Sequence, residues 1–302
     1  MMALQMIGYT DVSILGGGMQ AWEAAHAPPF DLQGALGDLL AGLPDDAGAV
    51  EVASLSGEGL FLLDVRNPEE YAAGFVEGAL NIPLRELAQH LDALPAMEAP
   101  LVLVDNSGFR SAIAMTTLRM LGYQNAQSLV GGIQAWTAAG LPLITQPVPA
   151  LPAGTEPQVD LDLLAMVDAY LPEVQPEAWS TVTPQALAEM PAGALPLLVD
   201  VRRPEAYAQG YIEDSLNIPL SELVQHLDQI PMDQPVVLVD ASGYHAILGM
   251  TVLQMLGYED VKVLAGGIEA WEAADLPLVT ALLDREWMVA ALFQFLPGFF
   301  VL

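Results

Sequence analysis

The chain of 302 residues contains no cysteine, and only eight of its residues are basic. Without a thiol it can form no disulfide bond or thiolate metal site, and it cannot hold sulfur as a persulfide. The bases, among them the single lysine Lys262, stand against 38 acidic residues, which gives a formal net charge of −30. Neutralising nucleic acid phosphates or anionic lipid headgroups needs clustered bases, so this balance argues against nucleic acid and anionic membrane partners.

Charged residues of both signs are also scarce, at 15% of the chain, whereas hydrophobic residues make up 53%. That composition is ample for two domain cores. Many surface positions must therefore be neutral or apolar. We expect part of this apolar surface to be buried against other copies or other proteins.

The two ends carry no clear targeting signal. Residues 1–9 have neither a basic start nor a long apolar run, so we expect no signal peptide, and both cytoplasm and cell surface stay open as compartments. Residues 287–302 are uncharged, but they are fewer than the roughly 20 needed to span a bilayer, and Pro297-Gly298 interrupts them. This tail is a weak membrane candidate, and we favour a buried packing helix.

An internal repeat decides the organisation. The sequence LLDVRNPEEY at 62–71 recurs as LVDVRRPEAY at 198–207, and NIPL at 81–84 recurs at 217–220. The pattern GGI-x-AW at 131–136 recurs at 266–271 and, as GGMQAW, at 17–22. So many matches in one order indicate two full units, preceded by the C-terminal part of a third.

The segments between the units repeat as well. Stripes of leucine and other apolar residues at helical spacing predict connector helices over 31–44 and 160–172, and a third over 284–297. Five prolines in 141–157 predict a semi-rigid spacer. The predicted organisation is a partial unit (1–27), a connector helix (28–45), a full unit (46–145), a proline-rich spacer with a connector helix (146–177), a full unit (178–280) and an apolar connector helix or tail (281–302).

Within a full unit the pattern alternates strands and helices. Apolar runs predict buried parallel strands at 60–65, 100–104 and 126–130. Helical segments are expected at 68–73, 84–94, 111–121 and 134–139, two of them ended by glycine. The sequence therefore predicts an α/β fold.

The ordered motifs DVR-x-PE-x-Y, NIPL and GG-x-x-x-W resemble the rhodanese family, over about 46–145 and 178–280 and in part over 1–27. The resemblance implies tandem domains, each a five-stranded parallel sheet flanked by helices. In active members, a loop between a strand and the next helix opens with the catalytic cysteine and carries Ser-Gly and often an arginine.

Both corresponding loops open with aspartate in this chain. The vestigial loops are Asp105, Asn106, Ser107, Gly108, Phe109 and Arg110, and Asp240, Ala241, Ser242, Gly243, Tyr244 and His245. Sulfur transfer needs a thiolate that forms a persulfide, which a carboxylate cannot do. We therefore expect no catalytic residue, cofactor or metal, and we expect each aspartate to cap the following helix and to fill an anion-binding loop from within.

The other repeated residues have structural interpretations. Arg66 and Arg202 are predicted to form ion pairs with Glu70 or Glu205. His90 and His226 are predicted at the surface or between domains, and Trp22, Trp136 and Trp271 as packing anchors. Asp240, Ser242 and His245 lie in one tight loop, a spacing that does not establish a linear catalytic triad.

Three functions follow from these observations. The leading one is an inactive repeat protein that acts as a structural, assembly or protein-binding scaffold, with self-association or a protein partner. The second is a sulfurtransferase remnant that works with a cysteine-bearing domain outside this chain. The third is a cation-dependent surface or adhesion module, which the excess of acidic residues suggests. As a separate alternative for the first loop, Asp105 with Asn106 offers hard oxygen ligands to a metal ion.

Overall fold

The structure, a computed structural model, describes residues 30–44, 46–55, 60–152, 154 and 157–280. The chain divides between Asp31 and Leu32, and the account below concerns the part from Leu32 onward. The predicted partial unit at 1–27, the third connector helix and the apolar tail within 281–302 lie outside the described residues, so those predictions stay predictions.

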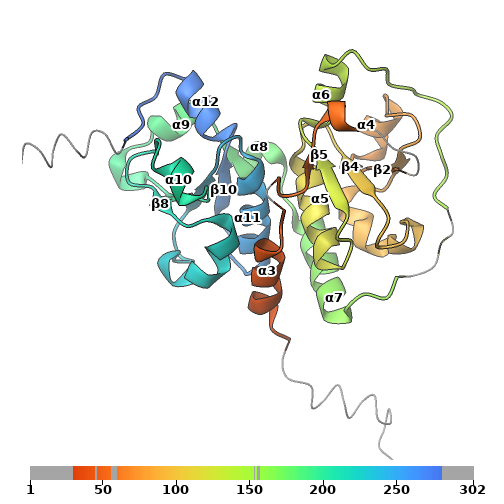
Figure 1. The fold of residues 1–302 in the computed structure, drawn as a ribbon, viewed down its shortest axis with the longest axis horizontal. Coiled ribbons are helices and arrows are strands. Elements are labelled where there is room, and N and C mark those ends of the chain that lie inside the picture. The colour runs from red at the N-terminus through yellow and green to blue at the C-terminus, as the bar shows by residue number, and fades with distance from the viewer. Residues whose placement is uncertain (1–29, 45, 56–59, 153, 155–156, 281–302) are drawn as a thin grey trace, which may run out of the picture. The chain divides into compact units, whose positions relative to one another are not determined.

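The first full unit is built on a parallel sheet of five strands (Figure 1). Its strand order is β1-β5-β4-β2-β3. The three predicted strands are the sheet's interior β2, β4 and β5, and the edges are two strands of two residues each. The bounds are β1 (Ala49–Val50), β2 (Phe61–Asp64), β3 (Leu80–Asn81), β4 (Leu101–Val104) and β5 (Ala126–Leu129).

The second unit repeats this topology. Its strands follow the order β6-β10-β9-β7-β8, again all parallel. The two sheets confirm the predicted fold class of tandem five-stranded parallel sheets flanked by helices. The bounds are β6 (Thr181–Val182), β7 (Leu197–Asp200), β8 (Leu216–Asn217), β9 (Val236–Val239) and β10 (Val261–Leu264).

The helix after the central strand is the most deeply buried in each unit. Every residue from Ser111 to Met120 in the first of these helices is buried. The two helices pack on each other, which explains why neither shows a polar face. The helices of the units are α4 (Pro68–Ala72), α5 (Phe109–Met120), α6 (Gly132–Ala138), α8 (Glu177–Ser180), α9 (Pro184–Ala188), α10 (Pro204–Tyr207), α11 (Tyr244–Met255) and α12 (Gly267–Ala273).

The segment 84–94 differs from its prediction as a regular helix. It forms two 3-10 helices, η2 (Leu84–Gln89) and η3 (Leu91–Ala93), separated at His90, whose φ of −126° is not helical. Leu84 and Leu87 are both buried, and a spacing of three residues places them on one face of a 3-10 turn. The second unit has the equivalent η6 (Leu220–Gln229), and shorter 3-10 turns are η1 (Val52–Ser54), η4 (Leu171–Glu173) and η5 (Ala192–Ala194).

The two connector helices pack in a reciprocal manner. Helix α3 (Leu32–Ala41), which precedes the first unit, packs on η6 of the second unit. Helix α7 (Leu161–Tyr170) and η4, which precede the second unit, pack on η2 of the first. Gln33 Nε2 donates to the Val224 carbonyl at 3.2 Å, which ties α3 to η6. Helix α3 thus packs mainly on the second unit, with a smaller contact to α5 of the first, and α7 packs on the first unit.

The largest hydrophobic cluster includes buried residues of both units and both connectors. Leu36, Leu63, Met115, Val199 and Leu248 all belong to it, and all are fully buried. Two smaller clusters cover the other faces of the sheets, one in each unit. No helix within the described ranges is long and apolar enough to cross a membrane.

Candidate functional site

Asp105 lies directly after β4 and before α5, and only 1% of it is exposed. Its Oδ1 accepts the N–H of Gly108 at 2.7 Å and the hydroxyl of Ser111 at 2.9 Å. Its Oδ2 accepts the N–H of Arg110 at 3.1 Å, and the N–H of Ser107 lies 3.5 Å away. The carboxylate therefore occupies the centre of the loop and satisfies donors at the start of α5 that have no partner inside the helix.

Asp240 has the same place in the second unit, between β9 and α11, and is also 1% exposed. Its carboxylate accepts the N–H groups of Gly243 and His245, and the His245 Nδ1 lies 3.4 Å from Oδ2. Ala246 replaces Ser111 here, so the second carboxylate lacks the serine hydroxyl donor. The two loops share their backbone arrangement, their aspartate and their Ser-Gly pair, but differ in the side chains around the carboxylate.

The Gly-Gly motif holds each loop in place. Gly132 has a φ of +52°, and a Cβ on it would meet the Asp105 carbonyl oxygen and the Asn106 carbonyl carbon. The N–H groups of Ile133 and Gln134 donate to the carbonyls of Asp105 and Asn106 at 2.7 and 3.1 Å. Only glycine permits this close approach of two main chains, which gives the repeated motif its physical reason.

The predicted ion pairs of Arg66 and Arg202 with the nearby glutamates are wrong. Arg66 instead binds Asp64 through Nε, at 3.0 Å to both oxygens, and through Nη2 at 2.6 Å. Arg202 binds Asp200 in the same way. In each pair the planar guanidinium donates to both oxygens of the aspartate that ends the strand two residues earlier, a geometry that favours this partner. Burial nevertheless raises the pKa of Asp64, because desolvation outweighs the hydrogen bonds and charge of Arg66.

Glu70 belongs to a second network, together with two loop residues. It accepts Nη1 and Nη2 of Arg110 at 2.7 and 2.9 Å and Nδ2 of Asn106 at 2.6 Å. The hydrogen bonds from Arg110 lower the pKa of Glu70 to about 2 despite partial burial. The second unit has no such network, since Ala206, Ala241 and His245 stand at the equivalent positions.

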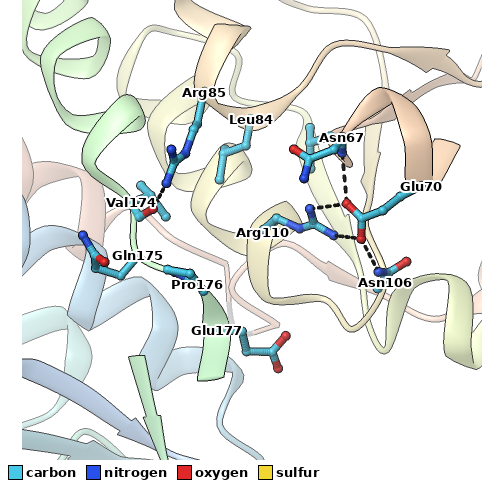
Figure 2. Close-up of a pocket in the computed structure, with 11 residues that line it drawn as sticks. Asn67, Glu70, Leu84, Arg85, Asn106, Arg110, Val174, Gln175, Pro176 and Glu177 are labelled. Carbon is cyan, nitrogen blue, oxygen red and sulfur yellow. Dashed lines mark hydrogen bonds and ion pairs between the residues drawn. The ribbon is translucent and has the colours of Figure 1, made fainter. Parts of the chain in front are cut away.

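A cavity of 520 Å³ lies over the first loop (Figure 2). One wall is the network of Glu70 and Arg110, and the other is the chain segment 174–177 that follows η4. Arg85 Nη2 donates to the Val174 carbonyl at 2.9 Å, and the Ser107 hydroxyl donates to Glu177 at 2.7 Å. Sequence reasoning missed Arg85 and Glu177, because no local pattern relates them to the loop.

Among the described residues, the histidines and tryptophans that the repeat singled out lie apart from the two aspartate carboxylates. His90 and His226 are each 41% exposed, beside Glu86 and Glu222. Nε1 of Trp136 and of Trp271 each donates to a proline carbonyl at 3.0 Å, while Trp22 lies outside the described residues. In the part of the chain that the structure describes, no group of three or more His, Asp or Glu side chains could hold a metal ion.

The sequence matches the family described as Rhodanese-like domain over residues 49–139 and 183–274. A sulfurtransferase from Allochromatium vinosum is 40% identical over 83 residues, which are 28% of this chain and 78% of the relative. The 3-mercaptopyruvate sulfurtransferase of Escherichia coli is 26% identical over 249 residues, 70% of this chain and 85% of the relative.

Among solved structures, a 3-mercaptopyruvate sulfotransferase from Escherichia coli covers 73% of this chain and 98% of its own, at 21% identity and a TM-score of 0.34. The first matched segment contains all five strands of its sheet, the second begins directly after β6 and contains β7 to β10, and the two segments include both aspartate loops. The chain belongs to the rhodanese-like domain family, with two domains and no cysteine in either.

Proposed function

We propose that this chain is a non-catalytic rhodanese-like protein that serves as a structural or protein-binding scaffold. One observation carries the proposal: both loops are occupied by a carboxylate that their own backbone N–H groups bind. A carboxylate offers no sulfur nucleophile, and the chain holds no thiol that could replace the missing one.

The carboxylate also opposes binding of an anionic substrate such as thiosulfate. The donors that would cradle the anion are already in use, and a second negative charge about 4 Å away would cost ~4 kcal/mol at an effective dielectric of ~20. The loop thus combines two independent obstacles to sulfur transfer, one chemical and one electrostatic.

The scaffold part of the proposal rests on the organisation of the chain. The two domains share one hydrophobic cluster with both connector helices. Exposed large apolar side chains remain outside this cluster, among them Trp179 at 69% and Leu161 at 76% exposure. We expect association to bury side chains of this kind, provided that they form a contiguous patch.

Two measurements test the proposal. The full chain should give no thiosulfate-to-cyanide transfer above background, with a cysteine-bearing thiosulfate sulfurtransferase as the positive control. Sedimentation velocity over a wide concentration range should show association. Turnover by the unmodified chain would contradict the inert loops, and a strict monomer at every concentration would contradict self-association as the scaffold's mode of assembly.

A second candidate is a sulfurtransferase remnant that needs a cysteine-bearing domain outside this chain. The intact network of Glu70, Arg110 and Asn106 favours it, because this network keeps an arginine at the first loop. Adding a separate cysteine-bearing rhodanese-like domain to the full chain should then raise the rate above that of the added domain alone. An unchanged rate would remove this candidate.

A further inference from the structure

The chain contains two cavities at equivalent places, one over each loop. The first, of 520 Å³, lies between the Asp105 loop and the segment 174–177. The second, of 390 Å³, lies between the Asp240 loop and the end of the connector α3 with the residues that follow it. Seven lining positions correspond through the repeat: Val65 with Val201, Asn67 with Arg203, Glu70 with Ala206, Leu84 with Leu220, Arg85 with Ser221, Asn106 with Ala241, and Arg110 with His245.

The two cavities have diverged in chemistry. Arg110 and Asn106 both donate to Glu70 on the wall of the first cavity (Figure 2). In the second cavity, Ala206 stands in place of Glu70 and Ala241 in place of Asn106, so only methyl groups remain at these two positions. Space that charged side chains fill in one unit is therefore lined by small apolar groups in the other.

Apart from the Asp240 carboxylate, which its own loop binds, the buried part of the second cavity is apolar. Leu40, Ala47, Val201 and Leu220 line it and are each at most 8% exposed. Leu43 adds a further apolar side chain from the connector. A volume of 390 Å³ with mostly apolar walls and few polar groups falls within the range of small-molecule sites.

The charged groups that line the second cavity are already engaged within the protein. Arg202 binds Asp200, and the Asp240 carboxylate accepts the N–H groups of Gly243 and His245. An ionic ligand would therefore find little unpaired charge to offset its desolvation, and the chain's formal charge of −30 further opposes an anion. The remaining polar groups, His245 and Ser221, can exchange a hydrogen bond with a neutral ligand.

We propose that the second cavity binds a small, uncharged and largely apolar molecule that carries one hydrogen-bonding group. This binding function is separate from the scaffold role, and we expect no counterpart in the first cavity, where the network of Glu70, Arg110 and Asn106 lies beside Val65 and Leu84. Burial of the ligand's apolar part against Leu40 and Leu220 supplies the affinity, and the polar group near His245 orients it.

Three probes of one ring size test the choice of ligand: phenol, benzoate and benzylammonium. Each is titrated into the full chain while the leucine methyl signals are followed by NMR. We expect phenol to shift the signals of Leu43 and Leu220 but not that of Leu84, their counterpart in the first cavity, and we expect the two ions to shift neither. Equal shifts with all three probes, or shifts at Leu84 as well, would overturn the proposal.

The repeat supplies the variants. Ala206→Glu places the first unit's glutamate in the second cavity and should weaken phenol binding about tenfold or more, because a carboxylate there must be desolvated. Ala208→Glu, two residues away on the exposed surface, adds the same charge outside the cavity and should leave binding unchanged. Should Ala206→Glu fail to fold, Ser221→Arg at an exposed lining position provides the same test. Undiminished binding in the lining variant would refute the site.

Discussion

Replacement of the Asp105 carboxylate tests the central geometric observation. In Asp105→Ala the N–H groups of Gly108 and Arg110 lose their partner, while Ser111 keeps a contact with Ser128 at 2.7 Å. A buried donor left without a partner costs about 1–3 kcal/mol. Two such donors cost about 2–6 kcal/mol, and water that enters from the cavity beside Arg110 recovers part of this. We expect the free energy of unfolding to fall by about 2–4 kcal/mol.

The assay is urea unfolding in sodium chloride and in sodium sulfate at equal ionic strength. Removal of the carboxylate frees the loop for an external anion, so sulfate should stabilise Asp105→Ala more than the unmodified chain. At a hundredfold excess over its Kd, a ligand adds about 2.7 kcal/mol. Any general salting effect appears equally in both proteins.

A matched variant separates the loop from simple charge removal. Asp233→Ala removes one exposed carboxylate outside both loops, before the start of β9 and so at the opposite end of that strand from Asp240, and should change stability by less than about 0.5 kcal/mol. The reasoning fails if Asp105→Ala is as stable as this control. The anion part of it fails separately if sulfate stabilises Asp105→Ala no more than the unmodified chain.

Three further predictions use the repeat or the pKa shifts. The pKa of Glu70 is held at about 2, against 4.5 for a free glutamate. The ionised side chain therefore adds about 1–2 kcal/mol to the free energy of unfolding above pH 4.5, and this contribution is lost as the pH falls toward 2. Glu70→Gln should remove this dependence of stability on pH from acid unfolding curves. The buried Tyr123 hydroxyl has no hydrogen-bond partner, whereas that of Tyr258 donates to a carbonyl at 2.8 Å. Replacement by phenylalanine should therefore cost about 1 kcal/mol at Tyr258 and nothing at Tyr123 in urea unfolding, and equal losses would contradict this. Asp105→Cys should form more thiocyanate from thiosulfate and cyanide than Asp240→Cys, because only the first loop keeps its arginine; the reverse order would show that the network is irrelevant.

The sequence predicted those parts of the fold that leave a local pattern. The interior strands β2, β4 and β5 are apolar runs, and the connector helices α3 and α7 have leucine stripes at helical spacing. The edge strands β1 and β3 have only two residues each, too few to show a period. Local pattern also could not separate a 3-10 helix from an α-helix at 84–94, since both bury residues spaced by three or four.

In the candidate site, too, the sequence predicted the contacts within a motif but not those between distant segments. The motifs located Asp105 and Asp240 between a strand and a helix, because those motifs are contiguous in sequence. Arg110 and Glu70 lie 40 residues apart, and Ser107 and Glu177 lie 70 apart, so their contacts depend on the tertiary fold. The incorrect partner for Arg66 has another cause. The prediction chose Glu70 in the helix that follows Arg66, whereas the observed partner is Asp64, two residues earlier on the strand.

The crossed placement of the connectors bears on how this protein can be dissected. A boundary drawn between the two matched segments would leave each fragment with a connector whose packing surface belongs to the other fragment. Deletion of 32–44 would uncover Leu220 and Val224 in the second domain, and loss of 161–173 would expose η2 in the first. Expression of either half alone would therefore produce an incomplete molecule, even though each half carries a whole sheet.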